Sequence, residues 1–288
     1  MARTSTDTPS AAGSTKRKPK LGQHFLLDVG AAQKIVEALG DVSNRTVIEI
    51  GPGRGVLTDV LAPRARRVIG IELDRVLAAQ LRMRYATRGN VEILESDFVT
   101  AEFTSMVGRR PGPLHDLRPT QAERVDFVGN LPYYITSDIV LRILALHRNI
   151  ERAVIMVQKE VADRIAAKPG SRDYGLLSAT AQLFARVDKL FTLPPEAFSP
   201  PPEVHSTVIR LTMAPRLEEL QVEEEPFIAF LKLAFAQKRK TLANNLRVQY
   251  DAAAIRAALK NAAVKSDVRA EAMPLEKSAG VFRALHAP

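Results

Sequence analysis

The sequence contains no cysteine, which excludes disulfide bonds, thiolate-bound zinc and any cysteine nucleophile. It also has no apolar run that approaches the roughly 18 residues of a membrane-spanning helix. Its five histidines include no pair with the spacing of metal ligands. We therefore expect a chain that needs neither a metal nor a membrane.

Acidic residues are outnumbered: 41 Lys and Arg stand against 32 Asp and Glu, which gives a net charge of +9 and a pI near 9.9. Such a balance is typical of proteins with a polyanionic partner, nucleic acid first, although an indifferent basic surface would look the same. Residues 1–20 are small, polar and basic without apolar periodicity, and we expect a disordered tail there.

From about residue 21, short β-branched runs alternate with stretches of helical spacing. The runs predicted to be strands are 46–51, 67–73, 91–97, 125–130, 152–158 and 206–213. This order implies a Rossmann-like α/β fold, a parallel sheet with helices on both faces. The polar stretch 103–124, with three prolines, is predicted to be a surface loop.

The strand signal ends after residue 213, and the Ala/Leu/Arg-rich remainder has helical spacing. We therefore expect an α/β domain at 21–213 and a second, smaller, all-helical domain at 214–288.

A glycine loop directly follows the first predicted strand, with Gly51, Gly53 and Gly55 in "EIGPGRG". Glycine allows a tight turn and the close approach of a ligand. The spacing is G-x-G-x-G, with Val56 at the sixth position, whereas a dinucleotide fingerprint has its third glycine there. The loop therefore favours S-adenosylmethionine over a nicotinamide cofactor.

Polar residues end the next predicted strands at the same edge of the sheet. Glu72 is placed to accept hydrogen bonds from both ribose hydroxyls of such a cofactor, unless it is an ordinary surface acid. Asp97 could accept a hydrogen bond from the exocyclic amine of its adenine. Asn130 ends the fourth strand, so we expect it to face the cofactor.

The stretch Asn130-Leu131-Pro132-Tyr133 could be an ordinary strand-ending turn, since Asn and Pro both favour turns. It could also activate the exocyclic amine of a target adenine, which is a poor nucleophile because its lone pair is delocalised into the ring. The Asn130 side-chain carbonyl and the Leu131 backbone carbonyl would accept hydrogen bonds from that amine. Pro132 would fix the turn, and Tyr133 would stack a flipped base.

Nine segments, in order, resemble the small-subunit (16S-type) ribosomal RNA adenine N6-dimethyltransferase family, within the rRNA adenine methylases. They are "LGQHFLLD" (21–28), "EIGPGRGVLT" (49–58), "IELD" (71–74), "SD" (96–97), "GNLPYYIT" (129–136), "QKEVADRI" (158–165), "YGLLSATAQ" (174–182), "PPEAFSPPPEVHSTVIRL" (194–211) and "AFAQKRKTLANNL" (234–246). The form Asn-Leu-Pro-Tyr, not Asn-Ile-Pro-Tyr, favours this family over the large-subunit resistance methylases.

The resemblance implies a class I methyltransferase that uses S-adenosylmethionine to dimethylate N6 of two adjacent adenines in small-subunit ribosomal RNA. Its partner would be an immature small ribosomal subunit, and we expect a cytoplasmic monomer. The cofactor positions carried over are His24, Leu26, Gly51, Glu72, Asp97 and Asn130, to which the glycine loop adds Gly53. Tyr134 departs from the family, which usually has Asn or His there.

Two further segments have competing interpretations. "LPPEAFSPPPEV" is either a stiff linker or, as the resemblance implies, a rigid loop whose Phe198 stacks the target base opposite Tyr133. Residues 232–247 hold five basic residues and no acid. We expect a basic helix whose Lys238, Arg239 and Lys240 contact RNA phosphates, although a solvated helix face is the common alternative.

Two other functions remain open at this point. One is methylation of large-subunit ribosomal RNA, which mapping of the modified base would separate. The other is a ribosome-assembly or nucleic-acid-binding factor whose methylation is incidental, which a cofactor-binding assay would test.

Overall fold

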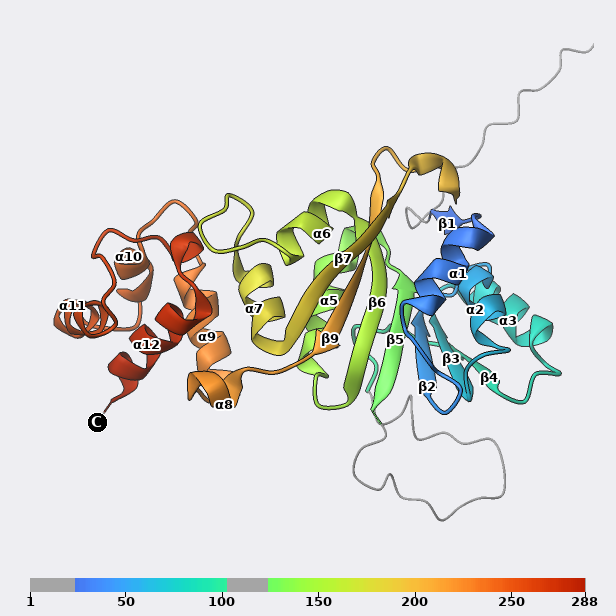
Figure 1. The fold of residues 1–288 in the computed structure, drawn as a ribbon, viewed down its shortest axis with the longest axis horizontal. Coiled ribbons are helices and arrows are strands. Elements are labelled where there is room, and N and C mark those ends of the chain that lie inside the picture. Colours follow the sequence, from blue (N-terminus) through green and yellow to red (C-terminus); the bar gives the residue numbers. More distant parts are fainter. Residues whose placement is uncertain (1–23, 103–123, 288) are drawn as a thin grey trace, which may run out of the picture.

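The computed structural model describes residues 24–102 and 124–287 (Figure 1). Within that part, the main sheet has the strand order β4-β3-β2-β5-β6-β9-β7. Its strands are β2 (Thr46–Ile50), β3 (Arg67–Glu72), β4 (Val91–Glu95), β5 (Val125–Asn130), β6 (Ile150–Gln158), β7 (Ala185–Leu193) and β9 (Ser206–Met213). The predicted tail and nearly all of the predicted loop at 103–124 lie outside the described residues.

Every predicted strand is present, and β4, β3, β2, β5 and β6 run parallel. The sheet is not wholly parallel, because β9 runs antiparallel to both of its neighbours, β6 and β7. Sequence analysis missed β7, whose residues are mostly polar or only partly buried. Its place at the edge of the sheet explains the weak signal, because an edge strand is less enclosed than a central one.

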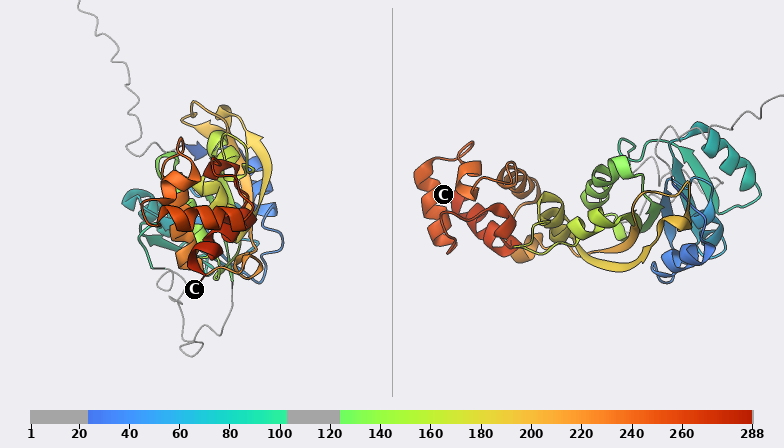
Figure 2. Two further views of the ribbon diagram at one scale, coloured as in Figure 1. Left: turned by 90° about the vertical axis from the view of Figure 1, so that its left-hand side faces the viewer. Right: turned by 90° about the horizontal axis from the view of Figure 1, so that it is seen from above.

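Helices cover both faces of the sheet (Figures 1 and 2). They are α1 (Val29–Glu37), α2 (Val56–Leu61), α3 (Arg75–Arg84), α5 (Thr136–Ala145), α6 (Lys159–Ile165) and α7 (Leu176–Phe184). Successive residues of a strand point to opposite faces. Val47 and Val68 accordingly join the apolar core formed with α1 and α2, whereas Ile48 and Ile69 join the core formed with α5 and α7.

The chain after β9 is helical in the described residues, as predicted. The helices are α8 (Leu217–Leu220), α9 (Glu224–Ala234), α10 (Leu242–Leu246), α11 (Ala252–Asn261) and α12 (Leu275–His286). They lie beyond α7 at one end of the sheet (Figure 2). Phe184 of α7 and Phe227 and Phe282 of these helices belong to one continuous apolar core. No described helix is long and apolar enough to cross a membrane.

Candidate cofactor and substrate site

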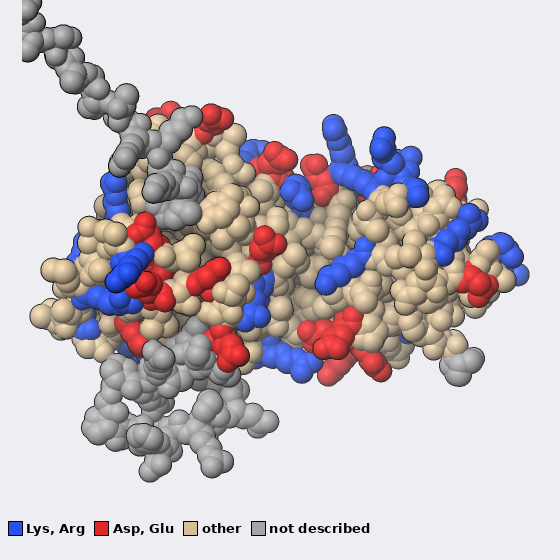
Figure 3. Space-filling model, turned by 180° about the vertical axis from the view of Figure 1, so that it is seen from behind, with Lys and Arg blue, Asp and Glu red and all other residues tan. Residues whose placement is uncertain are grey.

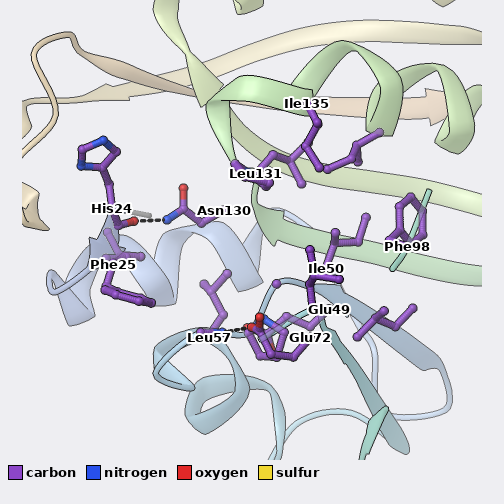
Figure 4. Close-up of a pocket in the computed structure, with 18 of the residues that line it drawn as sticks. His24, Phe25, Glu49, Ile50, Leu57, Glu72, Phe98, Asn130, Leu131 and Ile135 are labelled. Carbon is purple, nitrogen blue, oxygen red and sulfur yellow. Dashed lines mark hydrogen bonds between the residues drawn. The ribbon is translucent and has the colours of Figure 1, made fainter. Parts of the chain in front are cut away.

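A pocket opens at the carboxyl ends of the parallel strands β2, β3, β4 and β5 (Figure 4). Gly51, Glu72, Asp97 and Asn130 all line it, although they come from four different strand ends. Parallel strands bring their carboxyl ends to one edge of a sheet, which is where such folds bind ligands. The structure thus brings the predicted cofactor residues together in one cavity.

The glycine loop has a backbone that favours glycine at each of its three positions. Gly51, Gly53 and Gly55 have φ angles of 66°, 57° and 82°, in the left-handed region. A Cβ atom on Gly55 would lie 2.7 Å from the Tyr85 hydroxyl. That hydroxyl donates to the Asp59 carboxylate at 2.7 Å and lies 3.2 Å from the Gly55 carbonyl oxygen, so the loop is supported by the residue just after α3, which sequence analysis did not single out.

Glu72 is held in a fixed position at the end of β3. Its side chain is buried, and its two oxygens accept hydrogen bonds from the backbone N–H groups of Gly53 and Asp74, both at 2.9 Å (Figure 4). Burial raises the pKa of the Glu72 carboxyl, and the two N–H groups oppose that shift. A carboxylate has about four acceptor positions, so two remain for a ligand.

Asp97 lies two residues beyond the last residue of β4, Glu95, and is partly exposed. One of its carboxylate oxygens accepts a hydrogen bond from the Val99 N–H at 2.8 Å. The following residue, Phe98, is buried and also lines the pocket. Asp97 therefore offers its second oxygen to a ligand beside an apolar wall.

Glu49 was missed by sequence analysis, although an acid inside the apolar strand β2 was a signal. It is only 1% exposed, and it lines the pocket. The Thr58 hydroxyl donates to it at 2.6 Å, and burial raises its pKa to about 8, so it is largely protonated at neutral pH. The described residues contain no group of three or more His, Cys, Asp or Glu side chains that could hold a metal ion.

The backbone of His24 orients the side chain of Asn130. Its side-chain nitrogen donates to the His24 carbonyl at 2.7 Å (Figure 4). This leaves the side-chain oxygen of Asn130 without a hydrogen bond from any described residue. The Leu131 carbonyl is also free of such bonds, while the Leu131 N–H donates to the Met156 carbonyl at 3.0 Å. Pro132 then leads into a short 3-10 turn over Tyr133–Ile135.

Tyr133 is half-buried, and its ring lines the pocket. Its hydroxyl lies 2.6 Å from the Ser206 hydroxyl, and its ring centroid lies 5.3 Å from that of His24. Burial raises the pKa of the Tyr133 phenol, so it stays neutral at physiological pH. Ser206 is fully buried at the start of β9. Sequence analysis did not predict its hydrogen bond with Tyr133, because the two residues are far apart in the sequence.

The N-terminal segment forms one wall of the pocket through a small second sheet. Strand β1 (Phe25–Leu26) pairs antiparallel with β8 (Phe198–Ser199), and a His24 ring nitrogen lies 2.8 Å from the Pro200 carbonyl oxygen. His24 and Leu26 line the pocket, and their contact with the cofactor stays a prediction.

Phe198 does not occupy the place predicted for it. It pairs with Leu26, is only 3% exposed and packs in the apolar core on the α1 side of the sheet. The lining of the pocket includes Tyr133 but not Phe198. In this structure the two rings therefore do not flank the cavity, and base stacking by Phe198 stays a prediction.

The predicted basic helix is interrupted. Lys238, Arg239 and Lys240 are exposed in a turn between α9 and α10. The turn arises because Thr241 caps the start of α10, and because the Asn245 side chain donates to the Ala234 carbonyl, at the end of α9, and to the Gln237 carbonyl.

This turn, residues 238–240, is called the basic turn below. The Lys238 ammonium donates to the Arg172 carbonyl at 2.5 Å, so the basic turn lies against the loop between α6 and α7. Lys and Arg side chains gather at the upper edge of the molecule near this junction (Figure 3).

A sequence model described as ribosomal RNA adenine dimethylase matches residues 14–286. The chain belongs to the ribosomal RNA adenine dimethylase family. Among curated relatives, the "Ribosomal RNA small subunit methyltransferase A" of Koribacter versatilis is 64% identical over 269 residues, which cover 93% of this chain and 94% of that protein. The protein of the same name from Acidobacterium capsulatum is 55% identical over 276 residues, which cover 96% and 93%.

Solved structures share the fold of this chain. The crystal structure of the 23S rRNA methyltransferase ErmE matches with a TM-score of 0.64 and 28% identity, over 91% of this chain and 99% of that one. A dimethyladenosine transferase from Plasmodium falciparum matches with a TM-score of 0.69, over 90% and 96%. At 24% identity, that second likeness supports the fold alone.

We predict that Glu72→Ala weakens S-adenosylmethionine binding by about 1.5–3 kcal/mol, the range of hydrogen bonds to a charged group. Calorimetric titration measures the loss. The matched control is Glu95→Ala, because Glu95 ends the neighbouring strand directly beside Glu72 but has an exposed carboxylate. Unchanged affinity in a folded Glu72→Ala protein would remove Glu72 from the cofactor site.

Ser206→Ala should lower the rate of methyl transfer about 2- to 12-fold, because a neutral hydrogen bond contributes roughly 0.5–1.5 kcal/mol and here orients the Tyr133 ring. S-adenosylmethionine affinity should not change. Tyr133→Phe should give a similar loss, and the double variant no more than either single change. Rate losses that multiply would show that Ser206 acts through something other than Tyr133.

Proposed function

We propose that this chain transfers methyl groups from S-adenosylmethionine to N6 of two adjacent adenines in small-subunit ribosomal RNA, dimethylating each. The main support for this reaction is the orientation of the Asn130 side-chain amide. Its nitrogen is engaged by the His24 carbonyl, so its oxygen is the group presented to a substrate. A carbonyl oxygen can accept a hydrogen bond from an adenine N–H, and an amide nitrogen cannot.

The remaining groups complete a site for an amine nucleophile. The Leu131 carbonyl follows Asn130 directly and is likewise free to accept the second N–H. Two acceptors on one amine hold its nitrogen in place and draw electron density toward it. The Tyr133 ring, held by Ser206, offers a face on which the adenine can stack. Positioning of this kind supplies much of the acceleration in a transfer between two bound partners.

The pocket fits S-adenosylmethionine on its own geometry. The three left-handed glycines let the loop backbone lie close to a ligand, Glu72 has two free acceptor positions for ribose hydroxyls, and Asp97 lies beside the apolar Phe98. S-adenosylmethionine would be the methyl donor. Its sulfonium would supply the methyl group for the new N6–carbon bond, with S-adenosylhomocysteine as the leaving group and the amine proton passing to water. The chain's residues bind and orient both partners.

The choice of ribosomal subunit is supported by the relatives. Those at 64% and 55% identity are named for the small subunit, whereas the 23S rRNA methyltransferase ErmE is 28% identical. We propose the immature small subunit as the partner, with the basic turn contacting its RNA. We also propose a monomer, because one chain supplies the pocket and the basic turn, and a reaction in the cytoplasm, because the substrate is a maturing ribosomal subunit.

The deciding experiment is mass spectrometry of small-subunit ribosomal RNA from a strain that lacks this protein. Restoring the chain should restore dimethyladenosine, and restoring Asn130→Ala should not, although purified Asn130→Ala should still bind S-adenosylmethionine. Asn149→Ala, which truncates an exposed asparagine elsewhere in the α/β part, is the matched control. Dimethyladenosine that appears only in large-subunit RNA would overturn the choice of substrate. Near-normal turnover by Asn130→Ala would overturn its role.

Replacing Lys238, Arg239 and Lys240 together with Gln should weaken binding to the small subunit and flatten its salt dependence. Each lost phosphate contact lowers the slope of log affinity against log salt by about 0.7–0.9, so three contacts would lower it by roughly 2–3. Methyl transfer at saturating RNA should change much less. A salt titration of binding provides the measurement.

The matched control replaces Arg256, Lys260 and Lys265, three exposed cations on or just after α11 in the same helical part of the chain. It removes the same charge away from the basic turn. If both triple variants change the slope equally, the effect is one of net charge, and the basic turn is not a specific contact.

A further inference from the structure

Tyr134 is the exposed aromatic residue among those that line the pocket. Its side chain is 57% exposed, while the neighbouring Leu131 is buried and Tyr133 is half-buried. Its hydroxyl makes no hydrogen bond to a described residue. An exposed aromatic ring is not remarkable by itself. Here, however, the ring stands at the mouth of a cavity that is proposed to admit a nucleobase.

The backbone under Tyr134 is firmly held. The Thr136 hydroxyl donates to the Pro132 carbonyl at 2.9 Å, and the Ile135 N–H donates to the same carbonyl at 3.4 Å. Tyr133 is anchored separately through Ser206. The turn therefore presents two consecutive tyrosines with different surroundings, one directed into the protein and one left in solvent.

Base flipping removes a stacking partner from the neighbouring base, and the exposed ring of Tyr134 could replace that partner. When an adenine leaves its stack, the adjoining base loses a stacking partner, and the loss costs a few kcal/mol. An aromatic side chain at the mouth of the pocket can replace that partner, since every base has a π-face. Tyr133 and Tyr134 both line the pocket, Tyr133 partly buried and Tyr134 exposed, so the outer ring is accessible to a nucleotide that stays outside.

We propose that Tyr134 stacks on the nucleotide adjoining the target adenine and thereby holds the RNA backbone while that adenine occupies the pocket. This inference rests on the proposed function. It makes Tyr134 a positioning residue that acts on RNA and not on the methyl donor. The stacking needs the ring but not the hydroxyl, which is consistent with a hydroxyl that has no described partner.

The test compares Tyr134→Ala and Tyr134→Phe with the unaltered protein. Each protein methylates small-subunit particles that carry either the normal base or an abasic site next to the methylated adenine, on its 5′ or its 3′ side. On normal RNA, Tyr134→Ala should lower kcat/KM about 5- to 150-fold, the range expected for one base–aromatic stack. Tyr134→Phe should retain most of the activity. S-adenosylmethionine affinity should be the same for all three.

The abasic particles provide the decisive comparison. The unaltered protein should lose activity when the base on one side is missing, and Tyr134→Ala should lose little more on that RNA, because the stack is already gone. Equal losses from Tyr134→Ala on normal and abasic RNA would overturn the inference, as would a matching loss of donor affinity or of Tyr134→Phe activity. No adenine methylation by the unaltered protein on any particle would overturn the proposed function itself.

Discussion

The geometry of parallel strands governs this site. Because β2, β3, β4 and β5 run in one direction, their carboxyl ends meet at one edge of the sheet, where Gly51, Glu72, Asp97 and Asn130 line one pocket. Each lies at the end of a short strand of the sheet or just beyond it, so the pairing of the strands sets their relative positions. The loops that follow these strands complete the lining of a cavity whose position the sheet sets.

Residues 24–26 also determine the shape of the site, because they contact both Asn130 and the strand that contains Phe198. The His24 carbonyl fixes the Asn130 amide, and Phe25 and Leu26 pair with the segment that contains Phe198. The same short segment therefore orients the Asn130 amide and holds the strand that contains Phe198.

Local patterns in the sequence were sufficient for the main strands, the glycine loop and the chemical types at the strand ends. They were insufficient where a residue distant in the sequence determines the local structure. The two-residue strand at Phe198 exists because Leu26 lies beside it, far away in the sequence. The end of α9 depends on Thr241 and Asn245 beyond it. The edge strand at 185–193 has too few buried residues to show a strand pattern.

The shared core of α7 with the C-terminal helices has a consequence for how a target is chosen. Phe184, Phe227 and Phe282 belong to one packed body, and Lys238 rests on the loop that precedes α7. The span between the basic turn and the pocket is therefore set by packing and not by a flexible linker. If RNA is anchored at that turn, as proposed, only an adenine at one fixed distance from the anchor would reach the pocket, and the length of the protein would then select the target.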